Sequence, residues 1–138
     1  MHRALVVLLM FTALTGLVGG VLFVVKPDGS LLGADPALLL DTPFSDWFWP
    51  GMLLGILVGL GFLVAAIWEL QRGWKATWLS AFAGLGLIAF VSVEFAMIGF
   101  HPLQVIYGLV GVAVIVLAVR ILIAGAARRR EVTVAQDR

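Results

Sequence analysis

Apolar residues dominate four long segments of this chain, and short polar breaks separate these segments from one another. Each segment reaches roughly the 20 apolar residues that an α-helix needs to cross the hydrocarbon layer of a membrane. The pattern therefore predicts an all-α integral membrane protein with four transmembrane helices in an up-down bundle. The predicted spans are residues 4–25, 47–70, 77–98 and 102–127.

A basic residue, Arg3, precedes the first apolar run, as a basic residue precedes the apolar region of a secretory signal. A signal has an apolar region of roughly 7–15 residues and a cleavage site between small residues. The run at residues 4–25 is longer, has no clear site of that kind, and ends at a Lys26-Pro27-Asp28-Gly29 turn. We expect it to be a retained first span.

The composition leads to the same class of protein. Hydrophobic residues make up 62% of the chain and charged residues 12%, whereas charged residues approach about a quarter of a soluble domain. The length allows a single four-helix domain over residues 1–127, followed by a basic tail at residues 128–138 whose end, from Glu131 on, we expect to be frayed. The chain has no cysteine, which excludes disulfides and thiol chemistry.

The basic residues predict the orientation in the cell membrane. Short cytoplasmic segments retain Lys and Arg, and Lys26 alone falls on the other side of the predicted serpentine. Both termini are therefore expected in the cytoplasm, with residues 26–46 outside. The eight basic residues on the cytoplasmic side are Arg3, Arg72, Lys75, Arg120, Arg128, Arg129, Arg130 and Arg138. The positions of the tryptophans agree with this orientation, because tryptophan prefers the membrane–water interface. We expect Trp47 and Trp49 to be anchors at the outer interface, and Trp68, Trp74 and Trp78 to be anchors at the inner one.

Glycines recur at helical spacing in the predicted spans. Such stripes let two helix backbones approach closely, which matters in lipid because burial of apolar surface brings little gain there. We expect mainly contacts within the chain, while contacts to a protein partner or a second copy stay open. The helix-packing glycines are Gly16, Gly20, Gly51, Gly55, Gly59, Gly84, Gly108 and Gly111.

The first outer loop, residues 26–46, is too long for a tight turn and too apolar for a plain linker. Asp35-Pro36 is typical of a helix N-cap followed by proline at the first helical position, which predicts a short helix at residues 37–40. Thr42-Pro43 repeats this signal, and Pro50 is a further start or a kink in the second span. The loop is either a lid over the helix ends or a binding surface.

Several segments resemble a widespread family of small, uncharacterised bacterial four-span integral membrane proteins. The resemblance covers nearly the whole chain except the basic tail, and it implies a four-helix bundle with an outer loop of shared design but no activity. It rests on Pro27-Asp28-Gly29, Thr42-Pro43-Phe44-Ser45-Asp46, Pro50-Gly51, Arg72 with Trp74, Glu94, and Leu103-Gln104 with Tyr107-Gly108.

One polar constellation is expected near the outer surface. An ionisable residue within a span is expensive unless it is paired or hydrated, so Glu94, near the outer end of the third span, marks a candidate site. His101, Gln104, Asp41 and Asp46 approach from the same side. Glu94 can fix the outer loop through hydrogen bonds, bind a small ligand or lipid headgroup, or take part in proton or ion chemistry. A metal site is not predicted, because His2 lies at the opposite end.

At the inner end, Glu69 and Arg72 are three residues apart and can pair across one helical turn. We expect this pair to contribute helix-end electrostatics.

The sequence predicts a non-enzymatic multi-pass protein, an accessory, scaffold or regulatory subunit surrounded by membrane lipids. It contains no catalytic motif, and we expect no cofactor, no metal and no nucleic-acid partner. The alternatives are a small oligomeric transporter or ion-coupled carrier that uses Glu94, or a bundle that binds a lipid or small ligand. A carrier needs an acid accessible from both faces, whereas Glu94 lies off-centre, which favours the first class.

Overall fold

The computed structural model describes residues 2–40, 42–71 and 73–138, and this part of the chain is helical without any strand. Four helices in it are long and apolar enough to cross a membrane, which confirms the four predicted apolar helices. They are α1 (His2–Val25), the continuous run of α2 (Phe48–Leu53), η3 (Leu54–Leu60) and α3 (Gly61–Leu70), α4 (Trp74–Ile98) and α5 (Pro102–Gln136). The segment η3 is a π-helix, whose backbone hydrogen bonds span one residue more than those of an α-helix.

Helix α5 is longer than the sequence pattern predicts. It runs over 35 residues to Gln136, where the prediction places the end of the span at residue 127. The residues after Arg130 include the helix formers Glu, Ala and Gln and contain neither Gly nor Pro before the end of the chain, so nothing in the sequence stops the helix. The expected frayed tail is therefore wrong as far as Gln136.

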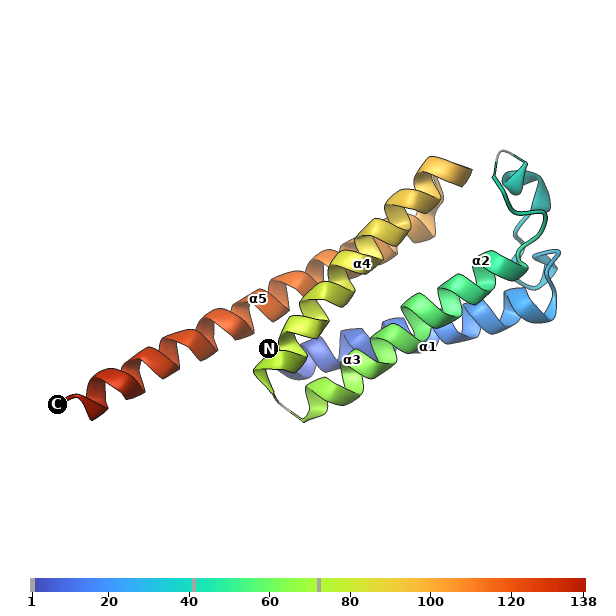
Figure 1. Cartoon of the computed structure of the whole chain (residues 1–138). Coiled ribbons are helices and arrows are strands. Elements are labelled where there is room, and N and C mark those ends of the chain that lie inside the picture. The colour runs from blue at the N-terminus through green and yellow to red at the C-terminus, as the bar shows by residue number, and fades with distance from the viewer. Residues whose placement is uncertain (1, 41, 72) are drawn as a thin grey trace.

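The first hairpin consists of α1 packed against α2, η3 and α3 (Figure 1). Glycines allow the two backbones to approach. A Cβ atom on Gly16 would lie 2.9 Å from the backbone nitrogen of Gly59, and one on Gly20 would lie 2.7 Å from the Cα of Gly55. Gly51 is buried in the same interface, beside Phe23. Because residue numbers rise on one helix as they fall on the other, the two helices are antiparallel.

The second hairpin consists of α4 and α5, which lie side by side over much of α4 (Figure 1). A Cβ atom on Gly84 would lie 3.0 Å from the carbonyl oxygen of Gly111, and one on Gly111 would lie 2.9 Å from Ile88. Gly108 differs from these two, since a Cβ atom there would meet nothing within 4 Å. The predicted glycine faces thus lie largely inside the two hairpins.

The two hairpins meet at the end of the molecule that holds the start of α1, the end of α3 and the start of α4, which we call the Glu69 end. Leu5, Leu9, Ala65 and Ala118 are fully buried there or in the core that leads to it. On α4, every fully buried residue lies at or before Leu87. Toward the opposite end, the loop end, the two hairpins diverge, and α5 runs on past the Glu69 end (Figure 1).

The first loop contains two 3-10 helices, η1 (Ser30–Leu32) and η2 (Pro36–Leu39). Asp35 caps η2, with its Oδ1 accepting a hydrogen bond from Ala37 N at 2.9 Å, which confirms the predicted short helix. Asp28 accepts from Ser30 N at 2.9 Å, and this bond holds the pKa of the Asp28 carboxyl below its usual value. Segment η2 contacts α4 and so reaches across to the second hairpin.

Trp47 anchors the return of the loop. Its backbone N–H donates to the carbonyl oxygen of Pro27 at 2.8 Å, and its ring stacks on Phe23 with 5.0 Å between ring centroids. The residue is only 5% exposed. The expectation of an interfacial anchor is therefore wrong for Trp47, because a stacking partner on α1 takes its ring inside; the neighbouring Trp49 is exposed.

Candidate functional site

A buried carboxylate, Glu69, lies at the end of α3 and connects it to α4. Glu69 is fully buried, and its two side-chain oxygens both accept hydrogen bonds. Thr77 Oγ1 donates to Oε1 at 3.0 Å, and Ser80 Oγ donates to Oε2 at 2.8 Å. Thr77 and Ser80 are three residues apart on α4 and therefore share one helix face. This satisfies the carboxylate, which would be costly to bury without partners.

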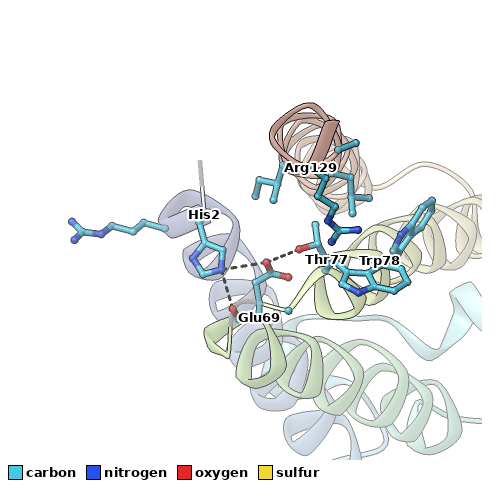
Figure 2. Close-up of a pocket in the computed structure, with 12 residues that line it drawn as sticks. His2, Glu69, Thr77, Trp78 and Arg129 are labelled. Carbon is cyan, nitrogen blue, oxygen red and sulfur yellow. Dashed lines mark hydrogen bonds and ion pairs between the residues drawn. The ribbon is translucent and has the colours of Figure 1, made fainter. Parts of the chain in front are cut away.

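His2 brings α1 to the same point (Figure 2). Its Nε2 atom lies 2.9 Å from the carbonyl oxygen of Glu69 and 3.3 Å from Glu69 Oε1. Because a carbonyl oxygen can only accept, the Nε2 atom must carry the proton in this hydrogen bond. The cluster of His2, Glu69, Thr77 and Ser80, which we call the Glu69 cluster, thus joins three helices.

An open pocket with a volume of about 760 Å³ lies beside the Glu69 cluster. The start of α1, the end of α3, the start of α4, and the part of α5 from Ile121 to Arg129 form its walls. On α5, Arg129 places its guanidinium carbon 5.7 Å from the centroid of the Trp74 ring, within the range of a cation–π contact. Figure 2 shows Arg129 extending from α5 toward Trp78 and Thr77 on α4. The pocket is lined by His2, Arg3, Glu69, Gly73, Trp74, Thr77, Trp78, Ile121, Leu122, Gly125, Ala126 and Arg129.

The chemistry of the Glu69 cluster follows from its donors and acceptors. A hydroxyl nucleophile requires a base that takes its proton. Here the hydroxyls of Thr77 and Ser80 point their protons at a carboxylate, and Ser80 Oγ also lies 3.1 Å from the carbonyl oxygen of Ala76. The Nε2 atom of His2 faces two acceptor oxygens of Glu69, its carbonyl oxygen and Oε1, rather than a hydroxyl group. The geometry is that of a polar connection between helices, with a pocket at its side.

The predicted outer residues His101 and Gln104 do come together, at the start of α5. The amide of Leu103 donates to His101 Nδ1 at 3.1 Å, and the amide of His101 donates to Gln104 Oε1 at 3.1 Å. Gln104 Nε2 also donates to the carbonyl oxygen of Gly99 at 3.0 Å. These bonds form a capping box around Pro102, the first helical residue, so both side chains serve the helix start.

The predicted acids of the outer site are placed differently. Glu94 is half-buried on α4, and no hydrogen bond or ion pair links it to His101, Gln104 or Asp46 in the described part of the chain. Asp46, directly before the N-cap residue Trp47, accepts from Phe48 N, the first amide of α2, at 3.0 Å. Asp41 lies outside the described residues. Among those described, no three His, Asp or Glu side chains are close enough together to hold a metal ion.

The Glu69 cluster was not predicted as a site. The sequence predicts that Glu69 pairs with Arg72, which lies outside the described residues, and it places His2 at the opposite end from His101. One signal was available: Thr77 and Ser80 share a face at the start of an apolar helix, directly after a glutamate that ends the preceding one. Hydroxyls on an otherwise apolar face indicate an internal hydrogen-bond partner.

The comparisons with known proteins add no relative. None of the protein-family models, curated proteins or solved structures compared with the chain matches it. The resemblance to the four-span bacterial family therefore stays a prediction, and the functional argument rests on the geometry alone.

Proposed function

We propose that this chain is a non-enzymatic multi-pass membrane protein that acts as an accessory, scaffold or regulatory subunit in the cell membrane. In this proposal its four apolar helices cross the bilayer in an up-down bundle, with both termini in the cytoplasm. The length and hydropathy of the helices support the insertion, and the accumulation of arginine at the Glu69 end supports the orientation. Membership in the four-span bacterial family is part of the same proposal.

The observation that carries the proposal is the Glu69 cluster. An acid inside a membrane is costly and marks function by default unless it is fully paired. Both oxygens of Glu69 accept hydrogen bonds from hydroxyls on α4, and His2 of α1 lies against the same residue. The acid is thus used to join helices, which suits a protein whose task is to hold an arrangement of helices.

The contact with a partner is best placed at the loop end. The glycine faces that were candidates for partner contacts pack within the two hairpins, so they are already covered. Large apolar residues are exposed in the loop and in the turn from α4 to α5, including Leu40 at 82% and Phe100 at 69%. An exposed apolar surface of this kind is suited to receive a helix or loop of another membrane protein.

An ion-coupled carrier is the second candidate, because Glu94 is half-buried in α4 without a hydrogen bond to another described residue. An unpaired acid in a span can bind a cation or a proton. Two measurements separate the candidates. Reconstituted in liposomes, the accessory protein should give no solute or proton flux, and a flux that Glu94→Gln abolishes would favour the carrier.

The orientation is tested by cysteine labelling in the natural cysteine-free background. Ser30→Cys, in the first loop, should react with an impermeant thiol reagent on intact cells. Thr133→Cys, near the end of α5, should react only after the cells are opened. Labelling at position 133 and not at position 30 would contradict the proposed orientation.

A further inference from the structure

We propose that the pocket beside the Glu69 cluster binds the phosphate headgroup of an anionic membrane lipid. This inference rests on the proposed membrane insertion and goes beyond it, because it assigns a ligand class to a particular site.

The charge of the pocket favours an anion. Two arginines, Arg3 and Arg129, line it against one acid, Glu69, which gives a formal charge of +1 with His2 neutral. The carboxylate of Glu69 is fully buried and already accepts hydrogen bonds from Thr77 and Ser80. Its charge is therefore engaged at the helix contact, whereas Arg129 is exposed and extends toward Trp78 and Thr77 on the pocket wall, where a ligand can reach it (Figure 2).

The depth of the pocket favours a lipid over a soluble phosphate. Helix α5 is roughly 52 Å long at 1.5 Å per residue, well beyond the roughly 30 Å of a hydrocarbon layer, so its last part extends into the headgroup region and the water. Arg129 follows directly on the predicted span that ends at residue 127. Apolar side chains, Ile121 and Leu122, line the same pocket on the membrane side. A lipid can place its phosphate against Arg129 and its acyl chain against Ile121 and Leu122.

The Arg129 side chain is already held in position. Its guanidinium carbon lies 5.7 Å from the centroid of the Trp74 ring, and this cation–π contact keeps the group beside the pocket. A guanidinium can bind a phosphate through two parallel hydrogen bonds. In the described part of the chain no carboxylate forms an ion pair with Arg129. Trp74 and Trp78 line the same pocket, and tryptophan is the residue whose indole N–H typically meets lipid headgroups.

The test uses the full chain in nanodiscs of phosphatidylcholine with phosphatidylglycerol, followed by native mass spectrometry that counts each lipid retained on the protein. The wild-type protein should retain phosphatidylglycerol in preference to phosphatidylcholine. Arg129→Gln removes a charge-assisted hydrogen bond to the phosphate in addition to a positive charge, so it should lower the preference about tenfold. Arg129→Lys keeps the charge but lacks the paired N–H groups of a guanidinium, so it should restore only part of the preference.

The matched control is Arg130→Gln. Arg130 is the next residue on α5 but does not line this pocket. Its loss removes the same charge from the same helix, and it should leave the preference within about twofold of wild type, because a charge exposed to salt is screened. Thermal unfolding in detergent checks that each variant is folded.

Three outcomes would overturn the inference. Equal loss in Arg129→Gln and Arg130→Gln would show a diffuse electrostatic effect, and no preference for phosphatidylglycerol in the wild type would exclude the site. Displacement of the lipid by soluble glycerol phosphate at comparable concentration would assign the pocket to a free phosphate ester. Failure of the chain to enter the nanodisc at all would instead contradict the proposed function.

Discussion

The two ends of the helix bundle use polar side chains in different ways. At the Glu69 end, side chains from α1, α3 and α4 bond to one another across helices, through His2, Glu69, Thr77 and Ser80. At the loop end, His101, Gln104 and Asp46 bond to backbone groups of their own helix starts. The first arrangement determines how helices lie relative to one another, whereas the second only determines where a helix begins. Stability between hairpins should therefore concentrate at the Glu69 end.

The largest difference in stability between the two ends is expected when the acid at each end is replaced by alanine. Glu69→Ala leaves the buried donors of Thr77 and Ser80 unmatched, and it should lower the free energy of unfolding in detergent by about 3 kcal/mol. Glu94→Ala, on the half-buried acid of α4, should cost less than about 1 kcal/mol. Chemical denaturation of the two variants gives both values. Equal losses would mean that the two ends are stabilised alike.

The next prediction separates packing within a hairpin from the connection between hairpins. A Cβ atom on Gly59 would lie 2.9 Å from the backbone nitrogen of Leu17, so Gly59→Leu should force α1 and η3 apart and cost about 2 kcal/mol. Gly86→Leu on α4 meets nothing within 4 Å of its Cβ and should stay within about 0.5 kcal/mol of wild type. Thermal unfolding checks both, and an unchanged Gly59→Leu variant would contradict the close approach of α1 and η3.

Two serines on α4 make the comparison within one helix. Ser80 donates to the buried Glu69, so Ser80→Ala leaves a carboxylate oxygen without its partner and should cost about 1–2 kcal/mol. Ser92 bonds only to Ile88 of its own helix and is exposed, so Ser92→Ala should cost less than about 0.5 kcal/mol. If denaturant titrations give the same value for both, the hydroxyl at position 80 does not support the connection between hairpins.

The smallest effect is expected at the helix start of the loop end. His101→Ala removes the acceptor for the amide of Leu103 and should cost about 0.5–1 kcal/mol, the usual value of an N-cap. The loss should be local, with faster hydrogen exchange at Leu103 and unchanged exchange at Thr77 and Ser80. Faster exchange at the Glu69 end as well would show that the two ends are coupled, and it would contradict a purely local role for the His101 cap.

Much of the fold could be predicted from the sequence, because the signals involved are local. Apolar runs of sufficient length predict the four helices, and Asp35-Pro36 predicts η2, since a cap and a proline act on the residues that follow them directly. Glycine spacing likewise shows which face of a helix can approach a neighbour. The length of α5 was missed because the end of an apolar run is not the end of helical propensity.

The candidate site could not be predicted, because it depends on which helices meet. Helical spacing shows that Thr77 and Ser80 share a face, but it does not show that Glu69 of the preceding helix points at that face. His2 is 67 positions away from Glu69 in sequence and reaches it only because α1 and α3 are antiparallel. The outer constellation failed to assemble for the opposite reason: nearby backbone N–H groups compete for His101, Gln104 and Asp46 more effectively than distant side chains do.

The π-helical segment η3 has a consequence for what a deletion would do. In an ideal α-helix, Gly51 and Glu69 are separated by about five whole turns and would point in the same direction. The wider turns of η3 shift the phase, so that the glycines meet α1 while Glu69 reaches the hydroxyls of α4. Removing one residue from η3 would therefore restore a regular α-helix and leave the two faces in nearly their present relation, because 17 α-helical steps of about 100° rotate the chain about as far as 18 steps that include one wide turn. A regular α-helix of unchanged length would instead rotate one half of the span against the other, and the chain would lose either its close helix pair or the partners of its buried acid.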